Sequence, residues 1–155
     1  MSISFNFLLT FNLYKPKKIN KMNIKTIFKI NIVLIFLQGL PLIISWFSPE
    51  FKSMLLVDVF GDNPSSDSIM IFDQFTLVLG LLIIGIVTFI YGTLSFNDLV
   101  TLKRLSLLFF ALTGFLALPD LINVFLGQPT APLPVIIMGL ITIGLFYYGS
   151  KKGTI

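Results

Sequence analysis

Four long apolar stretches constrain the fold of this chain more than any other feature of its sequence. They cover residues 27–47, 75–95, 105–126 and 133–150. A helix that crosses the hydrocarbon core of a bilayer needs about 20 mostly apolar residues, with a range of roughly 17 to 25. None of the four stretches has the strongly polar face that a helix of a water-soluble bundle would show. The sequence therefore predicts an all-α integral membrane protein.

The amino-acid composition also indicates that much of the protein surface faces lipid and not water. Only 12% of the 155 residues are charged, whereas a soluble domain carries roughly 25%. The chain contains no histidine and no cysteine. Haem held by His or Cys, iron–sulfur clusters, the usual zinc sites and nucleophiles activated by histidine are therefore excluded within this chain. We accordingly expect no cofactor and no metal.

Lysine and arginine are distributed unevenly around the four stretches. Every Lys and Arg except Lys52 lies before residue 30, between the second and third stretches, or after the fourth. Loops rich in Lys and Arg stay in the cytoplasm. The pattern predicts an antiparallel four-helix bundle with both termini cytoplasmic. The net charge of +4 then calls for no nucleic-acid partner, and anionic membrane lipids are the expected partners of the lysines.

The connections fit this topology. Residues 95–104 predict a short cytoplasmic turn, and residues 127–132 predict a tight outer turn between two antiparallel helices. The long connection, residues 48–74, lies outside. Within it, residues 49–60 predict either a short amphipathic helix at the membrane interface or a plain loop, and residues 61–68 predict turn and loop.

The two ends of the chain lie outside the predicted transmembrane domain, residues 27–150. Residues 1–26 form a basic N-terminal extension, and residues 151–155 form a cytoplasmic tail. The apolar part of the first 21 residues is too short to span a membrane, and no basic residue precedes it as a secretory signal would require. They are either a disordered or interfacial extension or an over-long start, because Met22 leads directly through lysines into the first stretch.

The polar and small residues of each stretch fall on one helical face. We expect that face to turn inward and the Leu, Ile and Phe face to touch lipid. Two interpretations stay open: helix packing through small residues and hydrogen bonds, or a cavity for a lipid, quinone or small amphiphile. The inward residues expected from the four stretches are Asn31, Gln38 and Ser45; Asp73, Thr76, Gly80, Thr88, Tyr91 and Ser95; Thr113, Asp120 and Asn123; and Gly139, Thr142, Phe146 and Gly149.

Asp120 is the most unusual of these residues, because it follows Pro119 late in an apolar run. Proline removes an N–H and bends a helix, and an ionisable residue in a span is a functional hypothesis by default. Asp120 is therefore either a polar helix end beside a kink or a functional residue. Since no Lys or Arg lies inside a span at its depth, it either stays neutral or faces a wet outer vestibule. Asp73 enters from the same side and could share that vestibule. The candidate ligand or proton site comprises Asp120, Asp73, Asn123, Thr113 and Gln38.

The layout resembles a family of proteins. The long first outer loop, the small-residue second span after an acidic turn and the third span "LKRLSLLFFALTGFLALPDL" are similar to small four-helix bacterial membrane proteins, described as DoxX-like or as domains of unknown function. The resemblance covers about residues 24–150. It implies a bacterial inner membrane and a left-handed four-helix bundle. It carries over no catalytic residue.

Three functions are compatible with the sequence. The first, which the sequence favours, is a non-enzymatic membrane scaffold or partner subunit, which would associate with another membrane protein or with copies of itself. The second is a binder or transporter of a small hydrophobic or amphiphilic molecule in the outer vestibule. The third is a membrane enzyme that uses Asp120 and Asp73 as acid and base. The sequence favours a protein that is not an enzyme.

Overall fold

The computed structural model describes residues 21–128 and 130–155. The predictions made for residues 1–20 lie outside this part of the chain. Within it, the chain forms only α-helices, which confirms the all-α prediction. Four of the helices, α1, α3, α4 and α5, are long and apolar enough to cross a membrane, which points to a multi-pass membrane protein. The helices are α1 (Ile24–Ser45), α2 (Pro49–Phe60), α3 (Ser66–Thr93), α4 (Leu99–Leu126) and α5 (Leu133–Lys152).

Helices α3 and α4 begin before the predicted apolar stretches, each at a residue whose side chain caps the helix. Ser65 caps α3 by accepting a hydrogen bond from the backbone N–H of Ser68 at 3.1 Å. Asp98 caps α4 in the same way, with the N–H of Thr101 at 2.7 Å. Hydrogen bonds from Thr101 also hold the pKa of Asp98 below its ordinary value, so the cap stays ionised. Residues 66–68 and 99–104 were expected in loops and are helical instead.

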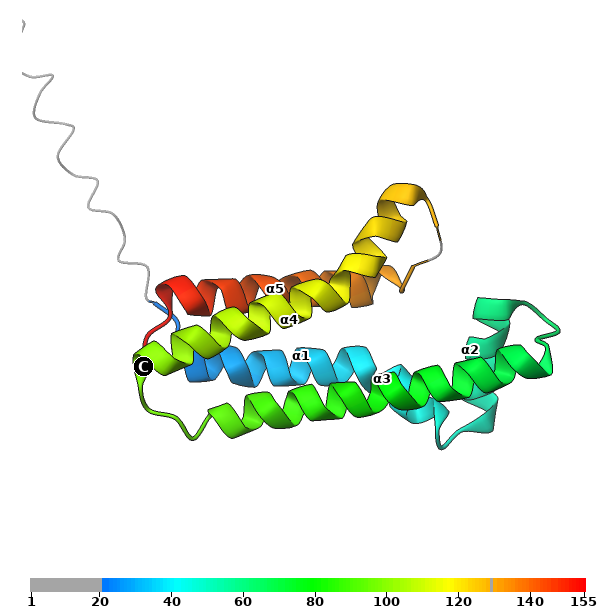
Figure 1. Ribbon diagram of the computed structural model, residues 1–155, viewed down its shortest axis with the longest axis horizontal. Helices are drawn as coiled ribbons and strands as arrows, with labels where there is room; N and C mark the ends of the chain where they lie inside the picture. Colours follow the sequence, from blue (N-terminus) through cyan, green and yellow to red (C-terminus); the bar gives the residue numbers. More distant parts are fainter. Residues whose placement is uncertain (1–20, 129) are drawn as a thin grey trace, which may run out of the picture.

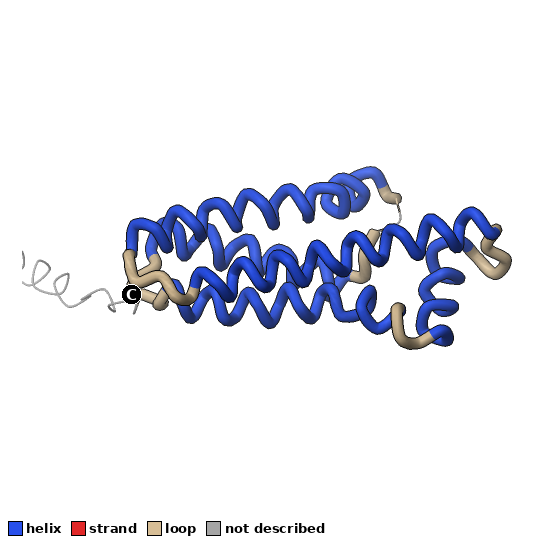
Figure 2. Tube along the Cα trace, turned by 60° about the horizontal axis from the view of Figure 1, so that its bottom comes forward, coloured by secondary structure: helices blue, strands red, loops and turns tan. Residues whose placement is uncertain are grey.

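The four long helices run side by side along one axis (Figure 1). Helix α1 packs extensively against α3 and α5, and α5 packs against α4, whereas α3 and α4 share few contacts within the described residues. Helix α2, predicted as helix or loop over residues 49–60, is a helix that crosses this axis at one end of the molecule (Figure 2). We call the end that carries α2 the distal end, and the opposite end, where the chain terminus lies, the terminal end.

The tightly packed core lies in the half of the molecule nearest the terminal end. Three phenylalanines from different helices meet there, with ring centroids of Phe28 and Phe109 5.8 Å apart, Phe28 and Phe146 5.9 Å apart, and Phe109 and Phe146 5.4 Å apart. Beside them, the Ser106 hydroxyl donates to the carbonyl oxygen of Phe146 at 2.7 Å. Aromatic pairs in this range stabilise a core beyond their buried area.

The first and last described segments are joined at the terminal end. The N–H of Ile24 donates to the carbonyl of Thr154 at 2.8 Å, and the N–H of Thr154 donates to the carbonyl of Met22 at 3.2 Å. Gly153 lies against Ile24 so closely that a Cβ would stand 2.2 Å from Ile24 Cγ1. The tail expected over residues 151–155 is therefore the last turn of α5 followed by a short pairing with the start of α1.

The inward faces of α1, α4 and α5 contain the polar residues expected there. Helix α3 differs in its second half, where Ile86, Ile90 and Thr93 are buried and Tyr91 is 69% exposed. Thr88 and Ser95 are also exposed, and their hydroxyls donate to the backbone carbonyls of Ile84 and Gly92, both at 2.8 Å. A hydroxyl that donates to a backbone carbonyl of its own helix needs no partner in the interior. The sequence-based prediction therefore placed Thr88 and Ser95 wrongly on the inward face.

Candidate functional site

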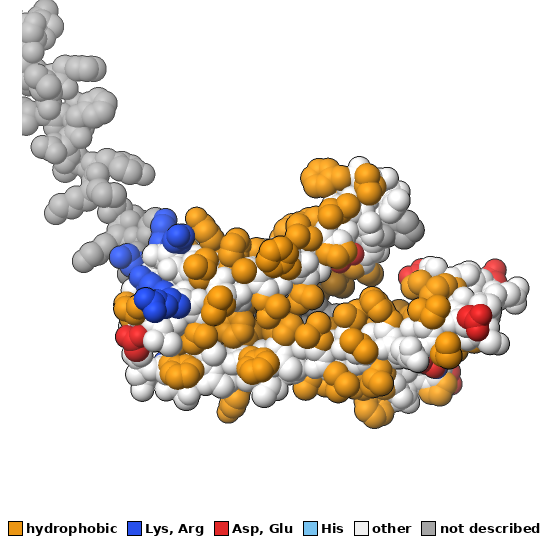
Figure 3. All heavy atoms as spheres, viewed as in Figure 1, with side chains coloured by type: hydrophobic (Ala, Val, Ile, Leu, Met, Phe, Trp, Pro, Cys, Tyr) orange, Lys and Arg blue, Asp and Glu red, His pale blue; other side chains and the backbone are white. Residues whose placement is uncertain are grey.

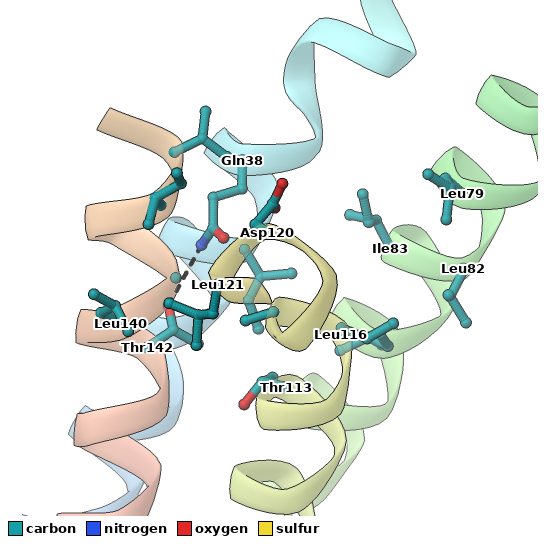
Figure 4. Close-up of a pocket in the computed structure, with 16 residues that line it drawn as sticks. Gln38, Leu79, Leu82, Ile83, Thr113, Leu116, Asp120, Leu121, Leu140 and Thr142 are labelled. Atoms are coloured by element: carbon teal, nitrogen blue, oxygen red, sulfur yellow. Dashed lines mark hydrogen bonds between the residues drawn. The ribbon is translucent and has the colours of Figure 1, made fainter. Parts of the chain in front are cut away.

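The distal half of the molecule contains a partly open cavity of about 200 Å³. All four long helices contribute to its wall; in Figure 4, α3 lies at the right, α5 at the left and α4 between them. Most lining side chains are apolar, among them Leu79 and Ile83 of α3 and Leu116 of α4. Its polar and glycine lining residues are Gln38, Thr113, Asp120, Gly139 and Thr142.

The distal end of α4, beside the cavity, bends away from the other helices (Figure 1). Pro119 lies inside α4, and the turns near and beyond it bend away in Figure 1. Proline at this position removes a backbone donor and presses its ring against the preceding turn, which bends a helix. The space-filling view shows a notch between this bent end and the distal ends of α2 and α3 (Figure 3). The kink expected at Pro119 thus lies beside the cavity, at the bent end of α4.

Gln38 and Thr142 link α1 to α5 across the cavity wall. The Gln38 amide nitrogen donates to the backbone carbonyl of Leu34 at 3.1 Å and to the Thr142 hydroxyl oxygen at 3.4 Å (Figure 4). A carbonyl only accepts hydrogen bonds, so the Leu34 contact fixes which end of the amide is the nitrogen. The amide oxygen of Gln38 has no hydrogen-bond partner among the described residues. It is therefore an available acceptor at the cavity.

Asp120 sits near the distal mouth of the cavity and is half-buried (Figure 4). Its Oδ1 accepts a hydrogen bond from the backbone N–H of Ala131 at 3.1 Å, which ties α4 to the connection leading into α5. No Lys or Arg of the described residues forms an ion pair with Asp120; the ion pair found among them joins Lys52 to Asp73. The second carboxylate oxygen, Oδ2, has no protein partner in the same part of the chain.

Asp73 does not join Asp120. It binds the Lys52 ammonium group through both carboxylate oxygens, at 2.6 and 2.8 Å, in a separate groove beside Trp46 and Thr76. The groove lies between α2 and the junction of α1 with α3, so the expected shared vestibule does not form. The acid–base pair that the enzyme hypothesis needs is consequently not assembled by these two carboxylates.

The other predicted site residues divide between the cavity and its surroundings. Thr113 lines the deeper part of the cavity, and its hydroxyl donates to the backbone carbonyl of Phe109 at 2.7 Å. Asn123 is half-buried one turn beyond Asp120 and is not part of the lining. The cavity therefore brings together Asp120, Gln38 and Thr113.

Sequence reasoning missed most of the apolar wall of the cavity. Leu79, Ile83 and Leu116 are ordinary lipid-span residues by composition, and only the meeting of helices reveals their role. Gly139 and Thr142 carried a signal, since both belong to the inward face predicted for residues 133–150. A Cβ at Gly139 would lie 3.4 Å from the Gln38 amide oxygen, so the glycine leaves room for that side chain.

Comparison with family models, with curated proteins and with solved structures finds no match to this chain. The resemblance to small four-helix bacterial membrane proteins therefore stays a prediction, and the site is interpreted from its own geometry. An apolar wall with a few oriented polar groups is typical of small-molecule sites. The arrangement suits binding, with hydrogen-bond acceptors at one end and a hydrocarbon surface at the other.

Proposed function

We propose that this protein binds a small amphiphilic molecule in the cavity between its four long helices, as the sequence-based alternative suggested. The partly open cavity in the distal half carries the proposal. Apolar cavities of ~150 Å³ hold a benzene-sized ligand, and pockets that enclose a whole drug-sized molecule start at about 300 Å³. A cavity of about 200 Å³ thus fits part of a hydrocarbon chain or one ring, and the rest of the ligand stays in the bilayer.

The proposal includes a membrane arrangement. The four helices form an antiparallel bundle across a bacterial inner membrane, with both termini in the cytoplasm and the cavity in the outer half. The gathering of Lys and Arg side chains at the terminal end supports this orientation (Figure 3). Helix α3 has 28 residues and so spans about 42 Å, beyond a hydrocarbon core of roughly 30 Å. Its distal turns then extend into the interface, where α2 lies with them.

Photolabelling in vesicles tests the binding. A monoacylglycerol with a diazirine in its chain is incorporated into phosphatidylcholine vesicles that contain the full-length protein, and labelled peptides are mapped by mass spectrometry. We expect saturable labelling of α3 and α4 near Leu82 and Leu116, which both line the cavity. Excess unlabelled monoacylglycerol should compete for it, whereas labelling of the remaining lipid-facing surface should rise linearly with the probe.

A matched pair of substitutions on α4 provides the control. Ala117 lines the cavity, whereas Ala111 is exposed and lies outside it. Ala117→Phe fills the cavity and should lower saturable labelling about tenfold, since each ~1.4 kcal/mol of lost contact is a factor of ten. Ala111→Phe should leave it unchanged. Labelling that never saturates, or that falls equally in both variants, would contradict the proposed binding.

The scaffold or partner-subunit hypothesis remains the alternative. An unsaturable, uniform labelling pattern together with a membrane protein that co-purifies in fixed stoichiometry would favour it.

A further inference from the structure

Resting on this proposed function, we infer that the ligand carries a positively charged, hydrogen-bond-donating head group, such as a primary ammonium on a single hydrocarbon chain. The juxtaposition of two unpartnered oxygen acceptors, Asp120 Oδ2 and Gln38 Oε1, with an apolar wall points to this class of ligand. The inference names the head group, whereas the proposed function concerns only an amphiphile in the cavity.

The first step concerns the charge of Asp120. A carboxylate in or near a span is retained only with a counter-charge, hydrogen bonds or water. One backbone N–H satisfies Oδ1, and the described Lys and Arg side chains leave Oδ2 without an ionic partner. Lys52 is the basic residue of the distal end, and Asp73 already occupies it at 2.6 Å. In the proposed complex, the ligand supplies the positive charge that Oδ2 lacks.

The second step concerns the direction of the hydrogen bonds. The Gln38 nitrogen is engaged by Leu34 and Thr142, which leaves the amide oxygen facing Gly139 at the cavity wall. The Thr113 hydroxyl is engaged by Phe109. Beside the Thr142 hydroxyl, which accepts from Gln38, the cavity presents two oxygen acceptors, Gln38 Oε1 and Asp120 Oδ2. An ammonium group with three N–H donors complements these two acceptors. A phosphate, sulfate or carboxylate head group would face Asp120 with a like charge.

The third step concerns the position of the head group. Gln38 and Asp120 lie toward the distal mouth, and Thr113 lies deeper, toward the phenylalanine core (Figure 4). The head group therefore sits at the distal mouth, and the chain runs against Leu79 and Leu116. Helices α3 and α4 share few contacts, so the cavity is open between them. A hydrocarbon chain in the outer half of the bilayer can enter from this side.

Competition against the photoreactive monoacylglycerol tests this head-group preference. Three competitors with the same saturated chain are compared: a primary alkylamine, the alcohol and the alkyl sulfate. The measured quantity is the mole fraction of each in phosphatidylcholine vesicles that halves the saturable labelling. We expect the amine to compete about tenfold more strongly than the alcohol, because a charge-assisted hydrogen bond is stronger than a neutral one. The sulfate should be the weakest competitor.

Two aspartate variants assign the preference to the cavity. Asp120→Asn should bring the amine and the alcohol within about twofold of each other, because the charge-assisted bond is lost. Asp120→Glu should keep the order. Asp62→Asn removes an equal charge from an exposed position in the loop between α2 and α3 and should change nothing.

The outcomes separate the two proposals. Saturable labelling with equal competition by all three compounds in the wild-type protein overturns the head-group inference and leaves the binding proposal intact. An absence of saturable labelling overturns both. If Asp62→Asn weakens the preference for the amine as much as Asp120→Asn does, the preference comes from the overall negative charge of the distal surface. That result also overturns the inference. If Asp120→Asn fails to fold, equal competition in the wild-type protein still overturns the inference, and Asp62→Asn still tests whether the distal surface as a whole causes the preference.

Discussion

A leucine at position 80 is expected to displace the Trp46 ring from α3 and to destabilise the protein by about 2 kcal/mol, within the range for overpacking a filled contact. A Cβ on Gly80 would stand 2.2 Å from Trp46 Cζ2, so even an alanine collides with the ring. Trp46 is the one tryptophan of the chain, and its fluorescence therefore reports this contact directly. Gly80→Leu should lower the free energy of unfolding in detergent micelles and shift the Trp46 emission to longer wavelength.

Gly85 on the same helix is the matched control. A Cβ there has no neighbouring atom within 4 Å, so Gly85→Leu should leave both the stability and the Trp46 emission close to those of the wild type. Equal stability and unchanged emission in Gly80→Leu would show that Trp46 does not pack on α3 as described here.

Loss of the Phe28 ring is expected to open the core at the terminal end. Phe28 is fully buried and contacts both Phe109 and Phe146. Phe→Ala substitutions in soluble cores cost about 3–5 kcal/mol. In a bilayer the separated helices remain in lipid, so the lost free energy comes mainly from lost packing contacts and not from transfer to water. We therefore expect Phe28→Ala to lower the unfolding free energy by about 2 kcal/mol.

Phe36→Ala controls for removal of the same side chain from the same helix. Phe36 is 44% exposed and lies outside the core, so its replacement should cost less than about 0.5 kcal/mol. Similar losses in the two variants, measured by unfolding in mixed micelles, would contradict a core centred on the three phenylalanines.

Hydrophobic length predicted the number of spanning helices, but it did not predict where they begin. Residues 66–74 are helical although they include Asp67 and Asp73, because the backbone hydrogen bonds of a helix continue until a cap ends them. Ser65 and Asp98 were visible as capping residues in the sequence. Using them would have extended the predicted spans at 75 and 105 toward the observed starts of α3 and α4.

The site was predictable in part. Gln38, Thr113 and Asp120 share a cavity because each lies on the inward face of its helix, which the 3.6-residue period reveals. The separation of Asp73 from Asp120 was not predictable, since it depends on Lys52 of α2 reaching Asp73 at 2.6 Å. Periodicity describes one helix at a time, and it does not say how far α4 departs from α3 after Pro119.

Accessibility of single cysteines tests most directly the claim that the helices cross a membrane with both termini on the inner side. The chain has no cysteine, so each variant carries one reactive site. Ser66→Cys and Thr130→Cys mark exposed positions at the distal end, and Ser95→Cys marks an exposed position at the terminal end. In intact bacterial cells that produce the protein, a membrane-impermeant maleimide should label the first two, and it should label Ser95→Cys only after the membrane is opened. Labelling of Ser95→Cys in intact cells, or protection of both distal positions, would contradict the account.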